Sequence, residues 1–260
     1  ENTFKHLELF RALGAEPPRY GHLPMIVNQQ GRPYSKRDGA AFVGEFREQG
    51  YLPEALFNYL LLLGWNPGDE REVLTREEMV ELFDIADCHV TAAKFDIKKL
   101  QWMNGEYIRR APKEDYKKEL ESRIAAAGLA VPDGFDIDLL ASQLQVRTKF
   151  WNDIPGNCRF LFTDDFEMDE KAVAKRLQKP GAKEILLDMA ERFAKLEPWT
   201  AAAGEAMVKE LSQGNGMGPW VHPIRVAVSG KGEGIGLFEM LELLGREKTV
   251  ARLAKAAEKL

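Results

Sequence analysis

The chain has 260 residues and a formal net charge of −5, from 36 lysines and arginines against 41 aspartates and glutamates. With 45% hydrophobic and 30% charged residues, it has the balance of a globular protein, which excludes collagen, low-complexity disorder and a disulfide scaffold. The acidic balance argues against indiscriminate nucleic-acid binding but leaves room for a local basic face.

The first 40 residues show both helix and strand patterns. Residues 3–13 carry apolar side chains at helical spacing before Gly14, which predicts a helix that ends there. Residues 22–27, with the sequence HLPMIV, are typical of a short buried strand, and residues 28–31 predict a turn. A short α/β segment is therefore expected at this end of the chain.

A polar loop over residues 32–39 places Ser35, Lys36 and Arg37 in consecutive positions between two glycines. Such a loop can bind a polyphosphate, because lysine supplies a mobile point charge and arginine a bidentate fork. The alternative is a solvated basic turn, since short basic runs are common on protein surfaces.

The chain after this loop is almost wholly helical in pattern. Pro53 fits the first turn of a helix that ends at Gly64. Thr75 and Glu78 form a capping box before another helix, and Asp96 is placed to cap a third.

The second half of the chain begins with a strongly charged run over residues 109–119, typical of a solvated face or a domain junction. Four helices are then predicted, over residues 137–144, 170–177, 182–196 and 200–212. Between two Gly-rich segments, residues 221–229 are expected to be extended, and an amphipathic helix is predicted from residue 237 to about residue 260.

Neither a membrane span nor a metal site is expected. The longest apolar stretch, residues 55–63, is far shorter than the roughly 18–20 residues that cross a bilayer. Cys88 and Cys158 are too few for a zinc cluster, and His89 and His222 lack ligand partners at suitable spacing, so each histidine is expected to be packed or exposed. The N-terminus has no secretory-signal pattern, which favours a cytoplasmic location.

An ordered series of short motifs runs along the whole chain. The sequence Ser35-Lys-Arg37 lies after a His-Leu-Pro strand and before the helix sequence GYLPEAL. The other members of the series, in chain order, are EPPR from Glu16, LGW from Leu63, FD from Phe95, KL from Lys99, WMN from Trp102, YIR from Tyr107, RVA from Arg225, GLF from Gly236, LG from Leu244 and ARL from Ala251. This series resembles the bacterial-type glutamyl-tRNA synthetases, which are class I aminoacyl-tRNA synthetases.

Two features depart from that family's pattern. Pro33 and Tyr34 stand where the family's loop commonly has a lysine followed by leucine or methionine, so one positive charge is lost. No HIGH-type histidine motif precedes the loop, because His6 and His22 lack that context. The resemblance therefore implies the C-terminal portion of a synthetase, without the HIGH-motif catalytic domain, that binds tRNA but does not catalyse alone.

The resemblance implies a mainly α fold in four parts. They are a remnant of the nucleotide-binding domain with the SKR loop over residues 1–40, an α-helical stem-contact domain over residues 41–112, and two all-α anticodon-binding subdomains over residues 113–178 and 179–260.

The same resemblance implies roles for the loop residues. Lys36 is expected to be catalytic, by stabilising charge on the ATP phosphates as the aminoacyl-adenylate forms. Ser35 and Arg37 are expected to bind ATP beside it. ATP with Mg²⁺ would serve the complete enzyme, with no cofactor bound by this chain alone.

Two elements of the helical half are implied to read the anticodon. Arg147 matches the position of an arginine in discriminating family members, and a surface salt bridge is the alternative. The second element comprises Arg225, Gly234, Ile235, Leu237 and Phe238. The family more often has Thr-Pro where this chain has Gly234-Ile235, and Leu237 and Phe238 could instead anchor the last helix. Phosphate contacts could come from Lys231, Arg246, Lys248 and Arg252.

The sequence thus predicts the tRNA-binding portion of a glutamate–tRNA ligase. The expected partner is tRNA(Glu), with ATP and glutamate bound through the absent N-terminal domain, no membrane contact and a monomeric state. The alternative is a free-standing, non-catalytic RNA- or partner-binding module derived from a synthetase.

Overall fold

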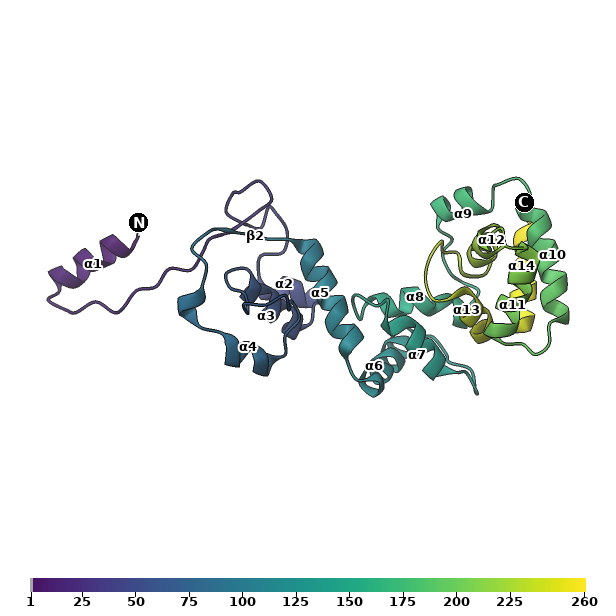
Figure 1. Ribbon diagram of the computed structural model, residues 1–260, viewed down its shortest axis with the longest axis horizontal. Coiled ribbons are helices and arrows are strands. Elements are labelled where there is room, and N and C mark those ends of the chain that lie inside the picture. Colours follow the sequence, from purple (N-terminus) through teal and green to yellow (C-terminus); the bar gives the residue numbers. More distant parts are fainter. Residues whose placement is uncertain (1) are drawn as a thin grey trace. The chain divides into compact units, whose positions relative to one another are not determined.

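The computed structural model describes residues 2–260 and is mainly helical, with one two-stranded sheet in that range. The chain divides into two compact units, a first unit over Glu1–Met103 and a second unit over Asn104–Leu260. Most of the elements of both units are labelled in Figure 1. No helix within residues 2–260 has the length and apolar character needed to cross a bilayer. The mainly α fold class is confirmed, while the four-part division stays a prediction.

The first unit holds short elements. In chain order they are α1 (Asn2–Ala12), β1 (Ile26–Val27), α2 (Val43–Glu48), α3 (Pro53–Leu62), α4 (Arg76–Leu82), the 3-10 helix η1 (Ile85–Asp87), β2 (Ala93–Lys94) and the start of α5 (Ile97–Arg110). The predicted helix over residues 3–13 is α1, none of whose residues is buried. The predicted strand over residues 22–27 is confirmed only for its last two residues, which pair with β2 in parallel, Ile26 with Ala93 and Val27 with Lys94.

An aromatic cluster beside this sheet forms the core that supports the polar loop. The ring of Phe95 lies 4.4 Å from Tyr34, 5.2 Å from Tyr59 and 6.0 Å from Phe46, measured between centroids. The backbone N–H of Asp96 donates to the hydroxyl of Tyr59 at 2.6 Å. The cluster therefore fixes both the loop and the start of α5.

The capping signals of the sequence are confirmed at three helix starts. Pro53 occupies the first turn of α3. The hydroxyl of Thr75 accepts the N–H of Glu78, whose carboxylate accepts the N–H of Thr75 in return. Asp96 accepts the N–H groups of Lys98 and Lys99 at the start of α5. Each bond satisfies a backbone donor that the helix itself leaves unpaired.

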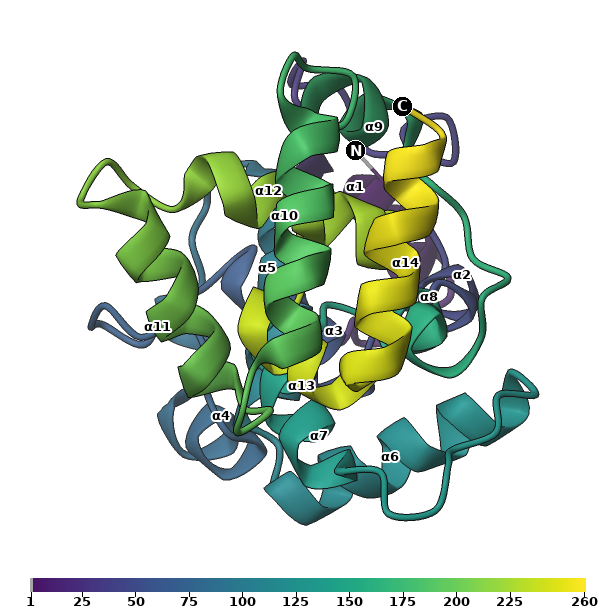
Figure 2. The same cartoon turned by 90° about the vertical axis from the view of Figure 1, so that its right-hand side faces the viewer.

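The second unit is all-helical. After the end of α5 it contains α6 (Lys113–Ala126), α7 (Ile137–Gln145), α8 (Asp153–Phe162), α9 (Glu170–Arg176), α10 (Ala182–Lys195), α11 (Ala201–Ser212), α12 (Gly218–Ser229), α13 (Leu237–Leu244) and α14 (Arg246–Glu258). Helices α10 and α14 pack most extensively and lie side by side in Figure 2. Phe193 of α10 and Leu253 of α14 are both fully buried.

The charged run over residues 109–119 continues into α6. Its apolar side chains Tyr116, Leu120 and Ile124 recur every four residues and are buried. This spacing places them on one face of the helix and leaves the charged residues on the other. The run is therefore a solvated face with a buried stripe behind it.

Two sequence-based expectations for the end of the chain are wrong. Residues 221–229, expected to be extended, belong to helix α12, and Ile224 and Val228 are fully buried one helical turn apart. The β-branched residues favoured a strand locally, but packing against α10 and α14 decides for helix. The single helix predicted from residue 237 is two helices, because Gly245 lies between them with φ of +85°.

Candidate nucleic-acid interface

The carboxylate of Asp38 organises the loop that contains Ser35, Lys36 and Arg37. One oxygen accepts the N–H of Ser35 at 2.9 Å and its hydroxyl at 3.0 Å. The other accepts the side-chain amide of Asn28 at 2.8 Å. The bond from Asn28 first, and then those from Ser35, lower the pKa of Asp38. The loop is thus shaped by hydrogen bonds to one exposed anion.

The positive charge of Lys36 is not neutralised by a carboxylate. Its ammonium lies 4.2 Å from the ring centroid of Phe42, and no residue within 2–260 forms an ion pair with it. The nearby carboxylate of Glu45 instead accepts the backbone N–H groups of Ala41 and Phe42, which lowers its pKa. Ser35, Lys36 and Arg37 are all exposed. These residues suit a polyphosphate, since mobile cations can close on it.

Pro33 and Tyr34 attach this loop to the unit beneath it. Pro33 bridges to Val27, and the N–H of Tyr34 donates to the carbonyl of Ile26 at 3.0 Å. The Tyr34 ring packs on Phe95 in the aromatic cluster. Tyr34, which departs from the family pattern, therefore packs against the core of the first unit.

The second unit brings Arg147, just after α7, close enough to Arg225, on α12, for their charges to interact. Arg147 follows the end of α7, is exposed, and donates to the carbonyl of Gln143 at 2.9 Å. Arg225 lies on α12, partly buried, and donates to the carbonyl of Ile235 at 2.6 Å. Burial lowers the pKa of Arg225, and the positive charge of Arg147 lowers it further, opposed by Glu239. Two guanidinium groups that repel each other are thus held at one place.

Neither arginine forms a salt bridge with any residue in the range 2–260. The salt-bridge alternative for Arg147 therefore finds no support. An anion or a base edge could use both guanidinium groups, since each retains free donors after its single backbone bond. We call Arg147, Arg225 and the backbone of residues 234–236 the arginine surface.

The Gly-rich segment before α13 completes the arginine surface. A Cβ atom on Gly234 would lie 3.9 Å from the guanidinium of Arg225, and its φ of +145° is one that side chains rarely adopt. The N–H of Gly236 donates to the side-chain oxygen of Gln143 at 3.3 Å, which ties this segment to α7. The backbone of Gly234 thus lies next to Arg225, while the carboxylate of Glu239 lies against Gly236.

The apolar members of the predicted anticodon set are in the core. Ile235, Leu237 and Phe238 are 2%, 4% and 8% exposed. The ring of Phe238 packs against Gly204, so closely that a Cβ atom on that glycine would lie 3.3 Å from the ring. This burial favours the alternative in which Leu237 and Phe238 anchor the last helices, and leaves contact with RNA to the backbone around them. The recognition role of these residues stays a prediction.

Three of the four cations expected to contact phosphate make internal bonds. Lys231 donates to the carbonyl of Gly156 at 2.6 Å. Arg246 donates to the carbonyl of Leu196 at 2.7 Å. Arg252 is 8% exposed and donates to Asp164 and to the carbonyl of Val228. Lys248 is exposed, and remains available for an RNA contact.

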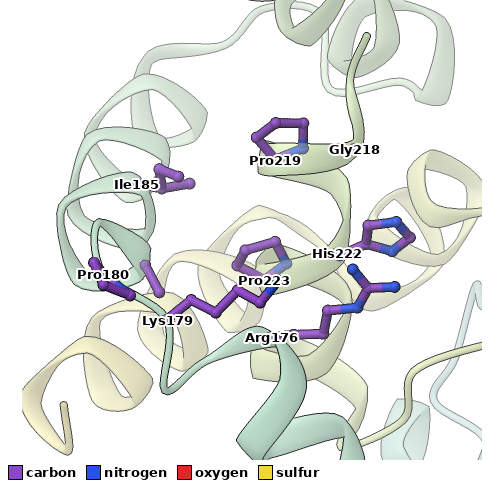
Figure 3. A pocket seen from close by; sticks show the side chains of 9 residues that line it. Arg176, Lys179, Pro180, Ile185, Gly218, Pro219, His222 and Pro223 are labelled. Atoms are coloured by element: carbon purple, nitrogen blue, oxygen red, sulfur yellow. The ribbon is translucent and has the colours of Figure 1, made fainter.

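A basic pocket in the second unit was not predicted from the sequence. Its lining includes two cations, Arg176 and Lys179, and the imidazole of His222 (Figure 3). These residues come from α9, the loop after it and α12, about forty positions apart in the chain, so no local pattern joins them. The only signal was a run of basic residues around α9, at positions 171, 175, 176 and 179. Among residues 2–260, no group of three or more His, Cys, Asp or Glu residues could hold a metal ion.

Two family models match this chain. The one described as an anticodon binding domain matches residues 93–257, and the one described as the catalytic domain of class I tRNA synthetases (E and Q) matches residues 1–102. The arginine surface lies within the first match.

Known proteins and structures agree with these models. The chain is 38% identical to the glutamate–tRNA ligase of Moorella thermoacetica over 98% of this chain and 54% of that protein. It is 41% identical to that of Thermobifida fusca over 100% of this chain and 56% of that protein. A crystal structure of a glutamate tRNA ligase from Elizabethkingia meningosepticum, in complex with its amino acid, matches with a TM-score of 0.78 and 28% identity, over 100% of this chain and 55% of the other.

The chain spans about half the length of the curated relatives it matches. The anticodon-binding model covers more than half of the chain, and the relatives and the solved structure are glutamate–tRNA ligases. The chain therefore belongs to the anticodon-binding-domain family, and the relatives and the solved structure that it resembles are glutamate–tRNA ligases.

Proposed function

We propose that this chain is the tRNA-binding portion of a glutamate–tRNA ligase whose complete protein charges tRNA(Glu) with glutamate, using ATP and Mg²⁺. The observation that carries the proposal is the arginine surface, where the charges of Arg147 and Arg225 act on each other and neither arginine forms an ion pair among residues 2–260. Two guanidinium groups held this way have unused donors that suit RNA. The proposal includes a monomeric protein that works in the cytoplasm.

The arginine surface has the parts that single-stranded RNA requires. Unstacked bases in a loop expose their edges, which an arginine fork can pair with at about 1–3 kcal/mol per good bidentate contact. Arg147 is exposed and can take such a position, while Arg225 is held by Ile235 and oriented toward Gly234. We assign Arg147 to base selection, and Arg225 with the backbone of residues 234–236 to holding the anticodon.

The loop of the first unit is assigned to ATP. Lys36 would neutralise charge on the ATP phosphates as adenylate forms, with Ser35 and Arg37 beside it. Losing one preorganised donor of this kind lowers rates by about 10² to 10³. ATP, Mg²⁺ and glutamate would be held largely by the remainder of the complete protein, so this chain alone is expected to bind tRNA without charging it.

The experiment is a binding titration of the 260-residue chain. We expect tRNA(Glu) to bind more tightly than an unrelated tRNA, with affinity that falls as salt rises, because backbone contacts release counterions. The variant Arg147→Gln should lose this preference. Arg192→Gln is the matched control, since Arg192 is exposed and already paired with Asp188. Equal binding of both tRNAs by the unaltered chain would refute the proposal.

The loop needs a separate test in the complete enzyme. Lys36→Ala should slow adenylate formation by about 10² to 10³ and leave the affinity for tRNA unchanged. Adenylate formation at the unaltered rate would remove Lys36 from the catalytic machinery.

A further inference from the structure

The basic pocket described above lies between the end of α9, the start of α10 and the first half of α12. Its volume is about 420 Å³, within the range of small-ligand sites. Pro180, Pro219 and Pro223 give it an apolar wall, and Arg176, Lys179 and His222 give it polar groups. In Figure 3, the guanidinium of Arg176 and the imidazole of His222 lie on the same side of the pocket.

The pocket has positive charge and no acidic lining residue. Neither Arg176, Lys179 nor His222 makes an ion pair or a side-chain hydrogen bond with any residue from 2 to 260. Burial and then the positive charges of Arg176 and Arg225 lower the pKa of His222. A pocket that concentrates unpaired cations attracts an anion.

Two helix starts add to this field. Residues Gly181 and Met217 precede α10 and α12, and neither makes a side-chain capping bond. Helices of 14 and 12 residues therefore begin at the pocket wall, where the positive ends of their dipoles favour a negative ligand. Glu184 lies in the first turn of α10 but does not line the pocket.

The pocket and the arginine surface both include residues of α12. His222 and Arg225 are three residues apart on α12, so their side chains are neighbours on one helix face. The charge of Arg225 acts on His222, and the charge of Arg147 acts on Arg225. One face of α12 thus joins the pocket, through His222, to the arginine surface, through Arg225.

We infer that this pocket binds a backbone phosphate of the RNA strand whose bases lie on the arginine surface. The inference rests on the proposed function. Arg176 supplies a bidentate fork to the phosphate oxygens, Lys179 a mobile charge and His222 a ring N–H. The proline wall packs against the adjoining sugar. Because phosphate contacts carry no sequence information, the pocket sets the register of the RNA and leaves base selection to Arg147.

The test uses an RNA hairpin of the anticodon arm of tRNA(Glu) and the full 260-residue chain, with binding measured by fluorescence anisotropy from about 50 to 200 mM salt. The double variant Arg176→Gln/Lys179→Gln should bind about tenfold more weakly. Its plot of log affinity against log salt should be shallower by about 0.7 for each phosphate that the variant no longer binds. Its preference for the anticodon sequence should be unchanged.

Lys195→Gln is the matched control, because it removes one charge at the opposite end of α10, about 20 Å away by helix rise. It should change neither affinity nor slope. Because Arg176 and Lys179 are not buried, we expect the variants to fold normally, and thermal unfolding of each variant checks this.

Three results separate the possible failures. An unchanged slope in the double variant, while Arg225→Gln weakens binding, would overturn the phosphate pocket and leave the proposed function standing. Failure of the unaltered chain to bind the hairpin would overturn the proposed function itself. The third result combines two observations: tight binding of inorganic phosphate or a 5′-mononucleotide, detected by shifts of the His222 ring signals, and an unchanged salt slope for RNA in the double variant. Together they would assign the pocket to a free ligand and contradict the RNA contact.

Discussion

The loop around Lys36 and the arginine surface present positive charge on very different supports. The loop is exposed, and its shape depends on hydrogen bonds from Asn28 and Ser35 to the carboxylate of Asp38. The arginine surface stands on buried helices, with Arg225 bonded to a carbonyl beside the core residue Ile235. A loop that is held only by a few hydrogen bonds of its own can open at small energetic cost. A side chain that is bonded to a core segment, such as Arg225, moves only when that segment moves.

The difference teaches how each support suits its proposed ligand. ATP phosphates change charge distribution during a reaction, so cations on a loop that rearranges can follow them. An anticodon must be compared with competing sequences, and discrimination benefits from groups already in place. The two supports should therefore fail in different ways when altered.

The largest expected effect is on the core support. Gly230 ends α12 with φ of +72°, and a Cβ atom there would lie 2.3 Å from the carbonyl oxygen of Glu167. Gly230→Ala should lower the free energy of unfolding by about 3 kcal/mol or more. The alanine would have a strained left-handed conformation, and the backbone around Glu167 would also have to move to make room for its Cβ atom. Urea unfolding measures this loss of stability. Gly214→Ala is the control, because Gly214 has a similar φ of +82° with no atom within 4 Å, and it should lose about 1–2 kcal/mol. Equal losses would mean that the Glu167 contact does not constrain α12.

A smaller effect is expected at Arg225, where the arginine surface is proposed to bind RNA. Arg225→Lys removes the fork and the bond to Ile235, so RNA affinity should fall by about 10- to 100-fold. The free energy of unfolding should fall by about 1 kcal/mol, since a carbonyl loses its donor. Fluorescence anisotropy measures the loss of RNA affinity, and urea unfolding measures the loss of stability. Arg192→Lys, at an exposed ion pair, should change neither. Loss of affinity with no loss of stability would show that Arg225 is not held by the core.

The loop should respond locally. Asp38→Asn replaces one of the two acceptor oxygens with an amide donor, so the bonds from Asn28 and from Ser35 cannot both remain. We expect trypsin to cut after Lys36 and Arg37 roughly three to ten times faster. Urea unfolding of the second unit should not change. Asp87→Asn, an exposed carboxylate in the same unit, is the control. If cleavage at the loop were unaffected, another contact would have to hold its shape.

The smallest effect is a pH dependence at His222. Burial and the cations Arg176, Arg225, Lys175 and Lys179 lower its pKa in the folded chain. The unfolded state, with a pKa of about 6.5, takes up the proton first, so stability should fall as pH drops below that value. RNA phosphate favours the protonated ring, so affinity should rise as pH is lowered from about 8 to 6.

His222→Gln isolates this contribution, because all other titrating groups are shared with the unaltered chain. The variant should be less sensitive to pH in thermal unfolding without RNA and in anisotropy with it. Identical pH profiles for both chains would mean that His222 titrates normally and takes no part in RNA binding.

Local signals in the sequence predicted helix starts well. Thr75, Asp96 and Pro53 all begin helices, because a cap depends only on residues a turn apart. Helix α12 was missed for the opposite reason. Its valines and Pro223 favour extended structure locally, while burial against two distant helices determines its form.

The candidate site shows the same division. The resemblance pointed to Arg147 and Arg225, and the fold brings them together from helices about eighty residues apart. It could not tell which cations were free, since Arg252 and Lys231 bond to carbonyls of other segments. The free cations of the pocket, Arg176 and Lys179, are distinguished only by the absence of such bonds within the described chain.

The division between the two units falls inside α5, which runs unbroken from Ile97 to Arg110. At its end, the side-chain amide of Gln145 donates to the carbonyls of Ile108 and Ala111. Backbone carbonyls are present whatever the residue, so any helix that ends there can accept this bond. A chimera of two ligases joined at residue 103 would splice unlike halves of one helix. A chimera joined just after Ala111 would keep the whole of α5 from one ligase, and Gln145 of the other could still donate to its carbonyls. That position is therefore the better crossover point for exchanging the helical units of two relatives.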